Sequence, residues 1–342
     1  MSTQFLGVDM AKDTFDAALW INDQAQWLGT FPNTLAGFQD LQTRILPQTA
    51  ETEETIHLIV EPTGGYELAL MNFACEQRWQ ISLPNPKQVR DWAKGQGRRA
   101  KTDQQDAMLL AKYGAKEQPR LWSPLPEAVA TLDDLLRRRD DLELMLRQER
   151  NRQSAFDSRP VVSASVQASV EQVIRALEEA LQSIERTIKQ HMHSHPDLDR
   201  AAKLLLSVPG IGQKTVLPIL VVMIRWHTLT AGQGAAKGLV AYVGLDPQPY
   251  ESGTSVRKRA TISRMGNRVV RRKLFMAALG GVRGNNALQH FYRRLVGRGK
   301  PKMVALVAAA RKLLVWAWAV FRTQTAFDPA RHEAQTVLKC LT

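Results

Sequence analysis

The chain has 342 residues, enough for two or three domains with substantial hydrophobic cores. It carries 46 Lys and Arg against 33 Asp and Glu, a formal net charge of +13, so we expect a polyanionic partner. The two cysteines, Cys75 and Cys340, stand far apart, which indicates a reducing compartment and argues against a structural zinc site.

The basic excess lies in one region. Between Tyr250 and Lys312 there are sixteen Lys and Arg and a single acid, Glu251, a net charge of +15. The remainder of the chain carries −2. We therefore expect the contact with a polyanion to involve this region.

No segment of the sequence predicts a membrane protein. The N-terminal residues lack the basic and apolar regions of a signal peptide. The stretch Met303–Phe321 is apolar, but Arg311 and Lys312 interrupt it, and no apolar run approaches roughly 18 residues. We expect a buried or nucleic-acid-facing helix there and no membrane partner.

The first 118 residues alternate between strand and helix patterns. Strands are predicted over 4–9, 14–21, 26–31, 57–60 and 80–83, and helices over 35–45 and 66–76. A three-stranded meander followed by α, β, α, β is the order of an RNase H-like, RuvC-type α/β fold. Open α/β sheets place their sites beyond the carboxyl ends of strands, where Asp9 and Glu61 fall.

Two further acids begin a predicted helix. Asp103 and Asp106 are three residues apart, which puts both carboxylates on one helix face. Taken alone, they are best explained as N-terminal acids that favour the helix dipole. Together with Asp9 and Glu61 they predict a cage for a divalent metal, with a basic, glycine-bearing loop at 94–101 beside it.

Residues 119–200 change character. Leucine and isoleucine recur at helical spacing among dense charges over about 125–156 and again over 170–191. We expect a helical hairpin or coiled coil, an element that usually sets dimer geometry. His191, His193 and His195 follow, and we expect them on an exposed loop rather than around a metal ion.

The stretch 204–215 has the pattern of a helix-hairpin-helix motif. An apolar helix is followed by Pro-Gly-Ile-Gly and by a second helix that opens near Thr215. Gly210 and Gly212 let the backbone approach a phosphate, and the free amides of the next helix meet the anion, with Lys214 adding charge. The alternative is an ordinary corner between two helices.

Ser252 lies on a Ser-Gly turn directly before a basic cluster. Cations around a hydroxyl can hold a scissile phosphate and stabilise its transition state. From spacing alone, however, Ser252, Thr254 and Ser255 are better explained as turn or capping hydroxyls. The candidate phosphate ligands of this region are Arg257, Lys258, Arg259, Arg264, Arg268, Arg271, Arg272 and Lys273.

Five motifs occur together in one order. They are Gly-Val-Asp9-Met-Ala-Lys, Val-Glu61-Pro-Thr-Gly-Gly-Tyr, Lys-Thr-Asp103-Gln-Gln-Asp106-Ala, Val-Pro-Gly-Ile-Gly-Gln-Lys-Thr and Tyr-Glu-Ser252-Gly-Thr-Ser-Val-Arg. With the predicted arm between them, the chain resembles, over nearly its full length, the DEDD transposases of the insertion-sequence one-ten family, which are bridge-RNA-guided recombinases.

The resemblance implies a RuvC-like domain (1–118) with Asp9, Glu61, Asp103 and Asp106 as the metal-binding tetrad, a coiled-coil linker (119–200) and a mostly helical transposase domain (201–342). It implies Mg²⁺, with Mn²⁺ as a substitute, and Ser252 as the nucleophile that forms a 5′-phosphoserine link. Thr254 stands where relatives often have serine, so Ser255 is the remaining rival.

The resemblance also implies the partners: donor and target DNA, a noncoding bridge RNA that chooses the sequences, and dimers that assemble into a tetramer with composite active sites. The expected location is the cytoplasm of a prokaryote, at the nucleoid. Two alternatives stay open. One is a metal-dependent, structure-specific nuclease of the Holliday-junction resolvase kind, using water; the other is a non-catalytic nucleic-acid-binding scaffold.

Overall fold

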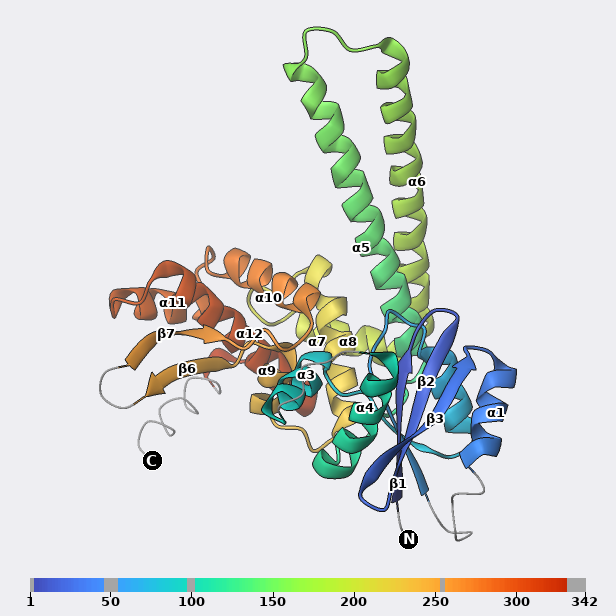
Figure 1. Cartoon of the computed structure of the whole chain (residues 1–342). Helices are drawn as coiled ribbons and strands as arrows, with labels where there is room; N and C mark the ends of the chain where they lie inside the picture. The colour runs from blue at the N-terminus through green and yellow to red at the C-terminus, as the bar shows by residue number, and fades with distance from the viewer. Residues whose placement is uncertain (1–2, 46–54, 97–101, 253–255, 331–342) are drawn as a thin grey trace. The chain divides into compact units, whose positions relative to one another are not determined.

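The computed structural model describes residues 3–45, 55–96, 102–252 and 256–330, without the side chains of residues 250–260 (Figure 1). Contacts divide the chain into two compact units, Met1–Pro124 and Leu125–Thr342. Each unit has its own architecture and is described by itself.

Unit 1 is built on a five-stranded sheet. Its strand order is β3-β2-β1-β4-β5, with β1 to β3 antiparallel and β4 and β5 parallel to β1. This order and these directions are the ones expected of an RNase H-like sheet. The strands are β1 Thr3–Met10, β2 Thr14–Ile21, β3 Gln24–Pro32, β4 Thr55–Val60 and β5 Gln80–Ser82.

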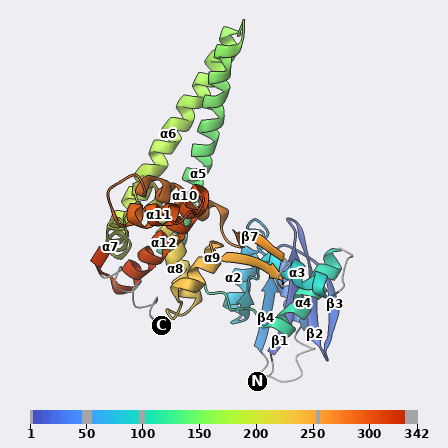
Figure 2. The same cartoon turned by 90° about the vertical axis from the view of Figure 1, so that its left-hand side faces the viewer.

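Helices cover both faces of this sheet (Figures 1 and 2). On one face, α1 (Leu35–Ile45) and α2 (Leu68–Glu76) pack against the alternating apolar side chains of β1 and β4, such as Leu6 and Leu58. On the other face, α4 (Asp103–Glu117) lies across β1 and β2, with α3 (Pro86–Gly95) beside it.

Unit 2 begins with a long pair of antiparallel helices. α5 (Glu127–Ser154) and α6 (Ala164–Ser194) run antiparallel beside each other (Figures 1 and 2) and move apart toward the end of the arm in Figure 1. Arg150 and Glu178 join them by an ion pair of 2.6 Å. At about 1.5 Å per residue the helices are about 42 and 46 Å long. α6 continues through His191 and His193, so the predicted loop is wrong there, while His193 is exposed as predicted. His191 is half-buried, and its Nε2 lies 2.7 Å from the Ala128 carbonyl oxygen.

The base of this helical pair is joined to the rest of the unit by ion pairs. Asp133 of α5 accepts from Arg225, at 3.0 Å, and Asp140 accepts from Lys273, at 2.9 Å. The Asp140–Lys273 pair is largely buried, since the two side chains are 19% and 13% exposed. A hydrophobic core shared with α5 and α6 surrounds these contacts.

The body of unit 2 is a cluster of helices with one β-hairpin, β6 (Pro247–Ser252) and β7 (Val256–Ile262). α12 is long and apolar enough to cross a membrane, but 56% of its most apolar window is buried inside the unit, so it is a core helix. The helices are α7 Pro196–Leu205, α8 Gln213–Leu229, α9 Ala236–Val243, α10 Arg268–Gly281, α11 Ala287–Gly297 and α12 Lys302–Thr323.

Candidate functional site

Two predicted site residues stand at neighbouring strand ends of unit 1. β1 and β4 pair in parallel from Thr3 with Thr55 to Val8 with Val60. The next residues in this register are Asp9 and Glu61. Because adjacent strands are about 4.8 Å apart, the register places the backbones of the two acids side by side.

Both acids face the same helix. A Cβ on Gly7 would lie 2.2 Å from the Ala107 carbonyl oxygen, so position 7 faces α4 and Asp9, two residues later, faces the same way. Ile59 also faces α4, because a Cβ on Gly114 would lie 2.5 Å from its Cγ1. Glu61 follows Ile59 by two residues and therefore shares the face of Asp9.

The direction of α4 brings its first turn to the same edge. Gly114 of α4 lies over Phe5, and Ala107 lies over Gly7, so the helix runs antiparallel to β1. Its N-terminus thus reaches the carboxyl end of β1, where Asp9 stands. The side chain of Thr102 caps the helix by accepting from the Gln105 amide at 3.3 Å, and the acids of the first turn are Asp103, which is exposed, and Asp106, which is half-buried.

The backbones of the four predicted tetrad residues therefore lie toward one edge and on one face of the sheet. All four offer carboxylate oxygens, the ligands that Mg²⁺ prefers. In the part of the chain that the structure describes, however, no three His, Cys, Asp or Glu side chains are grouped so that they could hold a metal ion. The acids share an edge but do not form a closed cage.

A buried acid that the sequence analysis missed organises the loop after β4. Glu67 is buried, and its Oε2 accepts from the amides of Thr63 and Gly65, both at 3.0 Å. The Thr63 hydroxyl in turn donates to the Glu61 carbonyl oxygen at 3.0 Å. Together these hydrogen bonds fix the backbone at Glu61. In the sequence, the Thr-Gly-Gly turn followed by an acid is the signal that would have revealed the Glu67 contact.

A second missed acid stands directly across from the tetrad. Asp16 of β2 pairs with Asp9 of β1, and residues directly opposite each other share a face of the sheet. The Asp16 carboxylate accepts from Trp27 Nε1 at 3.2 Å and from the Thr30 hydroxyl at 2.8 Å, both on β3. These bonds direct it toward β3.

The predicted nucleophile belongs to unit 2. Ser252 is the last residue of β6, and its backbone pairs with Val256 of β7. The side chains of Ser252, Arg257, Lys258 and Arg259, and the whole of Thr254 and Ser255, lie outside the described part of the structure. Their roles remain predictions.

The turn between α7 and α8 contains the predicted phosphate contacts. Gly210 has a φ of +97°, and a Cβ there would lie 2.7 Å from the Ala277 carbonyl oxygen, so packing on α10 requires this glycine. A Cβ on Gly212 would meet no described atom within 4 Å. The Gly212 amide donates to the Thr215 hydroxyl at 3.0 Å, which caps α8, and Lys214 is exposed. Of the two glycines in this turn, Gly210 is explained by packing, whereas no described atom near Gly212 requires a glycine there.

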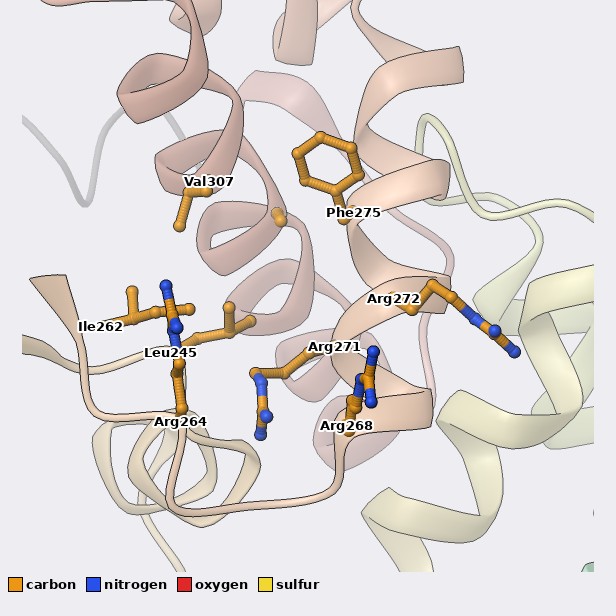
Figure 3. Close-up of a pocket in the computed structure, with 9 residues that line it drawn as sticks. Leu245, Ile262, Arg264, Arg268, Arg271, Arg272, Phe275 and Val307 are labelled. Atoms are coloured by element: carbon orange, nitrogen blue, oxygen red, sulfur yellow. The ribbon is translucent and has the colours of Figure 1, made fainter.

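Four arginines of unit 2 line a pocket of about 520 Å³ at the base of the β6–β7 hairpin (Figure 3). Arg271 donates to the carbonyl oxygens of Val243 and Gly266, and burial, with smaller contributions from Arg264 and Arg268, lowers its pKa. Lys273, in contrast, is engaged by Asp140. The pocket is lined by Leu245, Ile262, Arg264, Arg268, Arg271, Arg272, Phe275, Val307 and Ala310.

Two family models match separate parts of the chain. Residues 6–156 match the transposase model of the DEDD type named for IS110, and residues 202–293 match the transposase model of the IS116/IS110/IS902 family. Transposases of the DEDD type typically use a divalent metal. The first match contains all four acids of the sheet edge, and the second contains Ser252 and the arginine pocket as far as Phe275.

Similar proteins span the whole chain. The pilin gene-inverting proteins of Moraxella lacunata and Moraxella bovis are each 37% identical over 338 residues, which cover 97% of this chain and 100% of theirs. An uncharacterized 43.6 kDa protein of the insertion element IS110 from Streptomyces coelicolor is 30% identical over 159 residues, 45% of this chain and 36% of its own. The chain therefore belongs to the IS116/IS110/IS902 family of transposases, enzymes that bind and rearrange DNA.

Proposed function

We propose that the chain cleaves, exchanges and rejoins DNA strands through a covalent 5′-phosphoserine intermediate at Ser252, with Mg²⁺ held by a tetrad of acids. The observation that carries this proposal is the register of β1 and β4 together with the direction of α4. These put Asp9, Glu61, Asp103 and Asp106 at one edge of one face of the sheet.

The donor set suits a hard divalent cation. Four carboxylates at one edge repel one another, and a cation would draw their oxygens together. Bound there, Mg²⁺, or Mn²⁺ in its place, would supply positive charge that orients the scissile phosphate and stabilises the developing charge on its oxygens. The Glu67 contacts with the loop after β4 would hold the Glu61 backbone in place as this happens.

The serine step conserves the phosphodiester energy. The Ser252 hydroxyl oxygen would attack the phosphorus and lose its proton to solvent or a nearby base. The bond from phosphorus to the 3′-oxygen breaks, and that oxygen leaves as a 3′-hydroxyl after it gains a proton. In rejoining, a 3′-hydroxyl of the exchanged strand attacks the phosphoserine and releases Ser252. No water is consumed, so neither step needs an energy source.

The acids and the serine belong to different compact units, which supports a site shared between subunits. The α5–α6 pair is the element suited to bring copies together. Beyond its buried base it exposes apolar side chains, Leu144, Met145, Val166 and Val173, each between 43% and 49% exposed. We infer that these helices act as a coiled-coil arm in a dimer that assembles into a tetramer.

The nucleic-acid contacts would come mainly from unit 2. The turn between α7 and α8 would bind a backbone phosphate as a helix-hairpin-helix, because Gly212 has no neighbouring atom that requires a glycine. The resemblance adds a noncoding RNA of the element that pairs with donor and target DNA. Arg268 and Arg272 of α10 are exposed and would contact these nucleic acids, and Arg257, Lys258 and Arg259 of the hairpin stay predicted contacts.

The decisive experiment looks for the covalent product. The protein, its RNA, Mg²⁺ and end-labelled DNA are incubated, denatured and separated. We expect a protein–DNA adduct that disappears completely in Ser252→Ala and is strongly reduced in Asp9→Asn. Ser255→Ala is the matched control and should retain the adduct.

Each alternative predicts a different outcome. Cleavage of the DNA without an adduct in the wild-type protein favours a nuclease that uses water. DNA that is bound by the wild-type protein but neither cleaved nor joined to it favours a non-catalytic scaffold, and full activity in Asp9→Asn contradicts the proposed role of the tetrad. An adduct that persists in Ser252→Ala and is lost in Ser255→Ala moves the nucleophile to Ser255.

A second candidate function is inversion of a specific DNA segment. The pilin gene-inverting proteins match the chain from end to end, which favours it. Inversion and transposition use the same strand chemistry and differ in where the two sites lie. A plasmid with two inverted sites distinguishes them, since an inverting enzyme reverses the segment between the sites without moving it to another molecule.

A further inference from the structure

We propose that the arginine pocket of unit 2 receives one unpaired nucleotide of a DNA or RNA strand, with its base against the apolar wall and its phosphate among the arginines. The pocket has two chemically different sides. Figure 3 shows Phe275 and Val307 on one side and the guanidinium groups of Arg268 and Arg271 on the other, while the Arg264 side chain reaches up beside Ile262. The inference deepens the proposed nucleic-acid contact and needs neither the serine nor the metal.

The arginine side lacks an anion. Among the described residues, no carboxylate forms an ion pair with Arg264, Arg268, Arg271 or Arg272. Arg271 is fixed by carbonyl oxygens, which are neutral, and burial, together with the charges of Arg264 and Arg268, lowers its pKa. An anion entering the pocket would relieve this repulsion and accept several charge-assisted hydrogen bonds.

The loop that supplies Arg264 is held in place before any ligand binds. Arg264 has a φ of +56°, a left-handed conformation that is uncommon for a residue other than glycine. The loop is tied on both sides: the Ser263 hydroxyl donates to the Asp246 carboxylate, and the Arg264 amide donates to the Gly244 carbonyl oxygen at 3.2 Å. Strain of this kind persists where the surroundings over-determine it, as at binding sites.

The apolar side indicates a base. Arg271 and Arg272 lie three and four residues after Arg268 and four and three residues before Phe275 on α10, so the ring lies on the same helix face as the arginines. Across from it, α12 contributes Val307. A paired duplex presents its phosphates outward and keeps its bases stacked. Its bases would therefore not cover the apolar side chains of the pocket, which would stay exposed to water. An unpaired base can stack on an aromatic ring whatever its sequence.

The size of the pocket fits this ligand. Its volume of about 520 Å³ lies within the range of about 300–1,000 Å³ typical of small-ligand sites. One nucleotide therefore fits, whereas a stack of paired bases does not. The neighbouring phosphates of the strand would extend toward Arg272, which lies at the edge of the pocket in Figure 3.

The first test compares paired and unpaired nucleotides. The full-length protein, in EDTA, binds a labelled 20-base-pair duplex or the same duplex with one extra unpaired nucleotide at its centre, made as DNA and as RNA. Binding is followed by fluorescence anisotropy. We expect the unpaired nucleotide to strengthen binding about ten-fold in DNA, in RNA or in both. The nucleic acid that shows the effect is the one whose nucleotide the pocket binds. Equal affinities in both would overturn the proposal.

The second test assigns the preference to the pocket. Phe275→Leu keeps the apolar volume and removes the ring, so it should abolish most of the ten-fold preference while binding to the paired duplex changes less than about two-fold. Met276→Ala, at the next and exposed position of α10, is the control and should keep the preference. A preference that survives in Phe275→Leu contradicts the proposed stacking.

The third test concerns the phosphate. Arg268→Gln should weaken binding of the unpaired substrate about five-fold or more, whereas Arg283→Gln, an exposed arginine outside the pocket, should not. An equal loss in both variants would mean a diffuse charge effect and no pocket. Because these measurements use EDTA, they can fail while the covalent adduct still forms, and the adduct can fail while they succeed.

Discussion

The two units differ in net charge and in the structural elements that position their charged side chains. Unit 1 has twelve Lys and Arg against fifteen Asp and Glu, a net charge of −3, and unit 2 has 34 against 18, a net charge of +16. Unit 1 places its acids through the backbone of a sheet and a helix packed tightly upon it. Unit 2 places its arginines along one helix face and on one loop held by hydrogen bonds.

The difference suits the function that we propose for each unit. Carboxylates that are to share one small cation need closely fixed positions, and the register of β1 and β4 fixes where the backbones of Asp9 and Glu61 lie. Cations that contact a long polyanion act at several points along it. A helix face and a loop are sufficient there, because each phosphate contact adds its own share of affinity.

The largest effect is expected from a mutation that disturbs the tight packing of α4 on the sheet of unit 1. Gly7→Ala introduces a Cβ 2.2 Å from the Ala107 carbonyl oxygen and 2.2 Å from the Ala111 amide nitrogen. Since both are backbone atoms, α4 must shift, and we expect the free energy of unfolding of unit 1 to fall by about 3 kcal/mol. Urea denaturation of the full chain measures this change.

Gly95→Ala is the control for this prediction. A Cβ at Gly95 meets no described atom within 4 Å, and the residue ends α3 in the same unit. The substitution should keep or raise the free energy of unfolding, by less than about 1 kcal/mol. Equal losses in the two variants would show that α4 does not depend on the absence of a side chain at position 7.

Acid should weaken unit 1 through one buried histidine of its sheet. Burial lowers the pKa of His57 from 6.5 to about 4, and its Nε2 lies 2.8 Å from the Ser82 hydroxyl. Between these values the unfolded chain takes up a proton that the folded chain does not. The free energy of unfolding is therefore complete above about pH 6.5 and falls by about 3 kcal/mol as the pH drops to 4.

Thermal unfolding of wild type and His57→Gln between pH 4 and 8 measures this contribution. The variant should lose a part of the pH dependence, because glutamine does not titrate. His290→Gln, at an exposed position of unit 2, should leave the pH dependence as it is. A pH profile that is unchanged in His57→Gln would contradict the assignment.

The smallest expected effect concerns one phosphate contact of unit 2. Lys214→Gln at the start of α8 should weaken DNA binding a few-fold and reduce the slope of log K against log salt by about 0.9, the value for one phosphate. Lys203→Gln is the matched control, since Lys203 already pairs with Asp199 at 2.6 Å on α7. Equal slopes for Lys214→Gln and wild type would remove Lys214 from the interface.

Local patterns predicted most of the fold. The strand at Thr14–Ile21 and the helix at Leu35–Ile45 begin and end where hydrophobic periodicity places them. These predictions succeed because they depend on neighbours in the sequence. The strand ends at Asp9 and Glu61 also lie where the pattern placed them, whereas the role of the two acids in a site stays a prediction.

Contacts between distant residues could not be predicted in the same way. Nothing near Lys273 in the sequence indicates Asp140, 133 residues earlier, as its partner. The left-handed conformation of Arg264 depends on Gly244 and Asp246, which belong to another segment. Glu67 is a different case, because its partners Thr63 and Gly65 are local and the Thr-Gly-Gly turn before it was a signal that the sequence analysis missed.

Under the proposed function, the β6–β7 hairpin would set where a strand is cut. Leu245 and Ile262 at its base line the arginine pocket, and Ser252 ends β6 five residues beyond Pro247. At about 3.3 Å per residue, the base of the hairpin and Ser252 are about 17 Å apart along the strand. If a strand is held in the pocket and cut at Ser252, the length of the hairpin would determine the distance between the bound nucleotide and the broken bond.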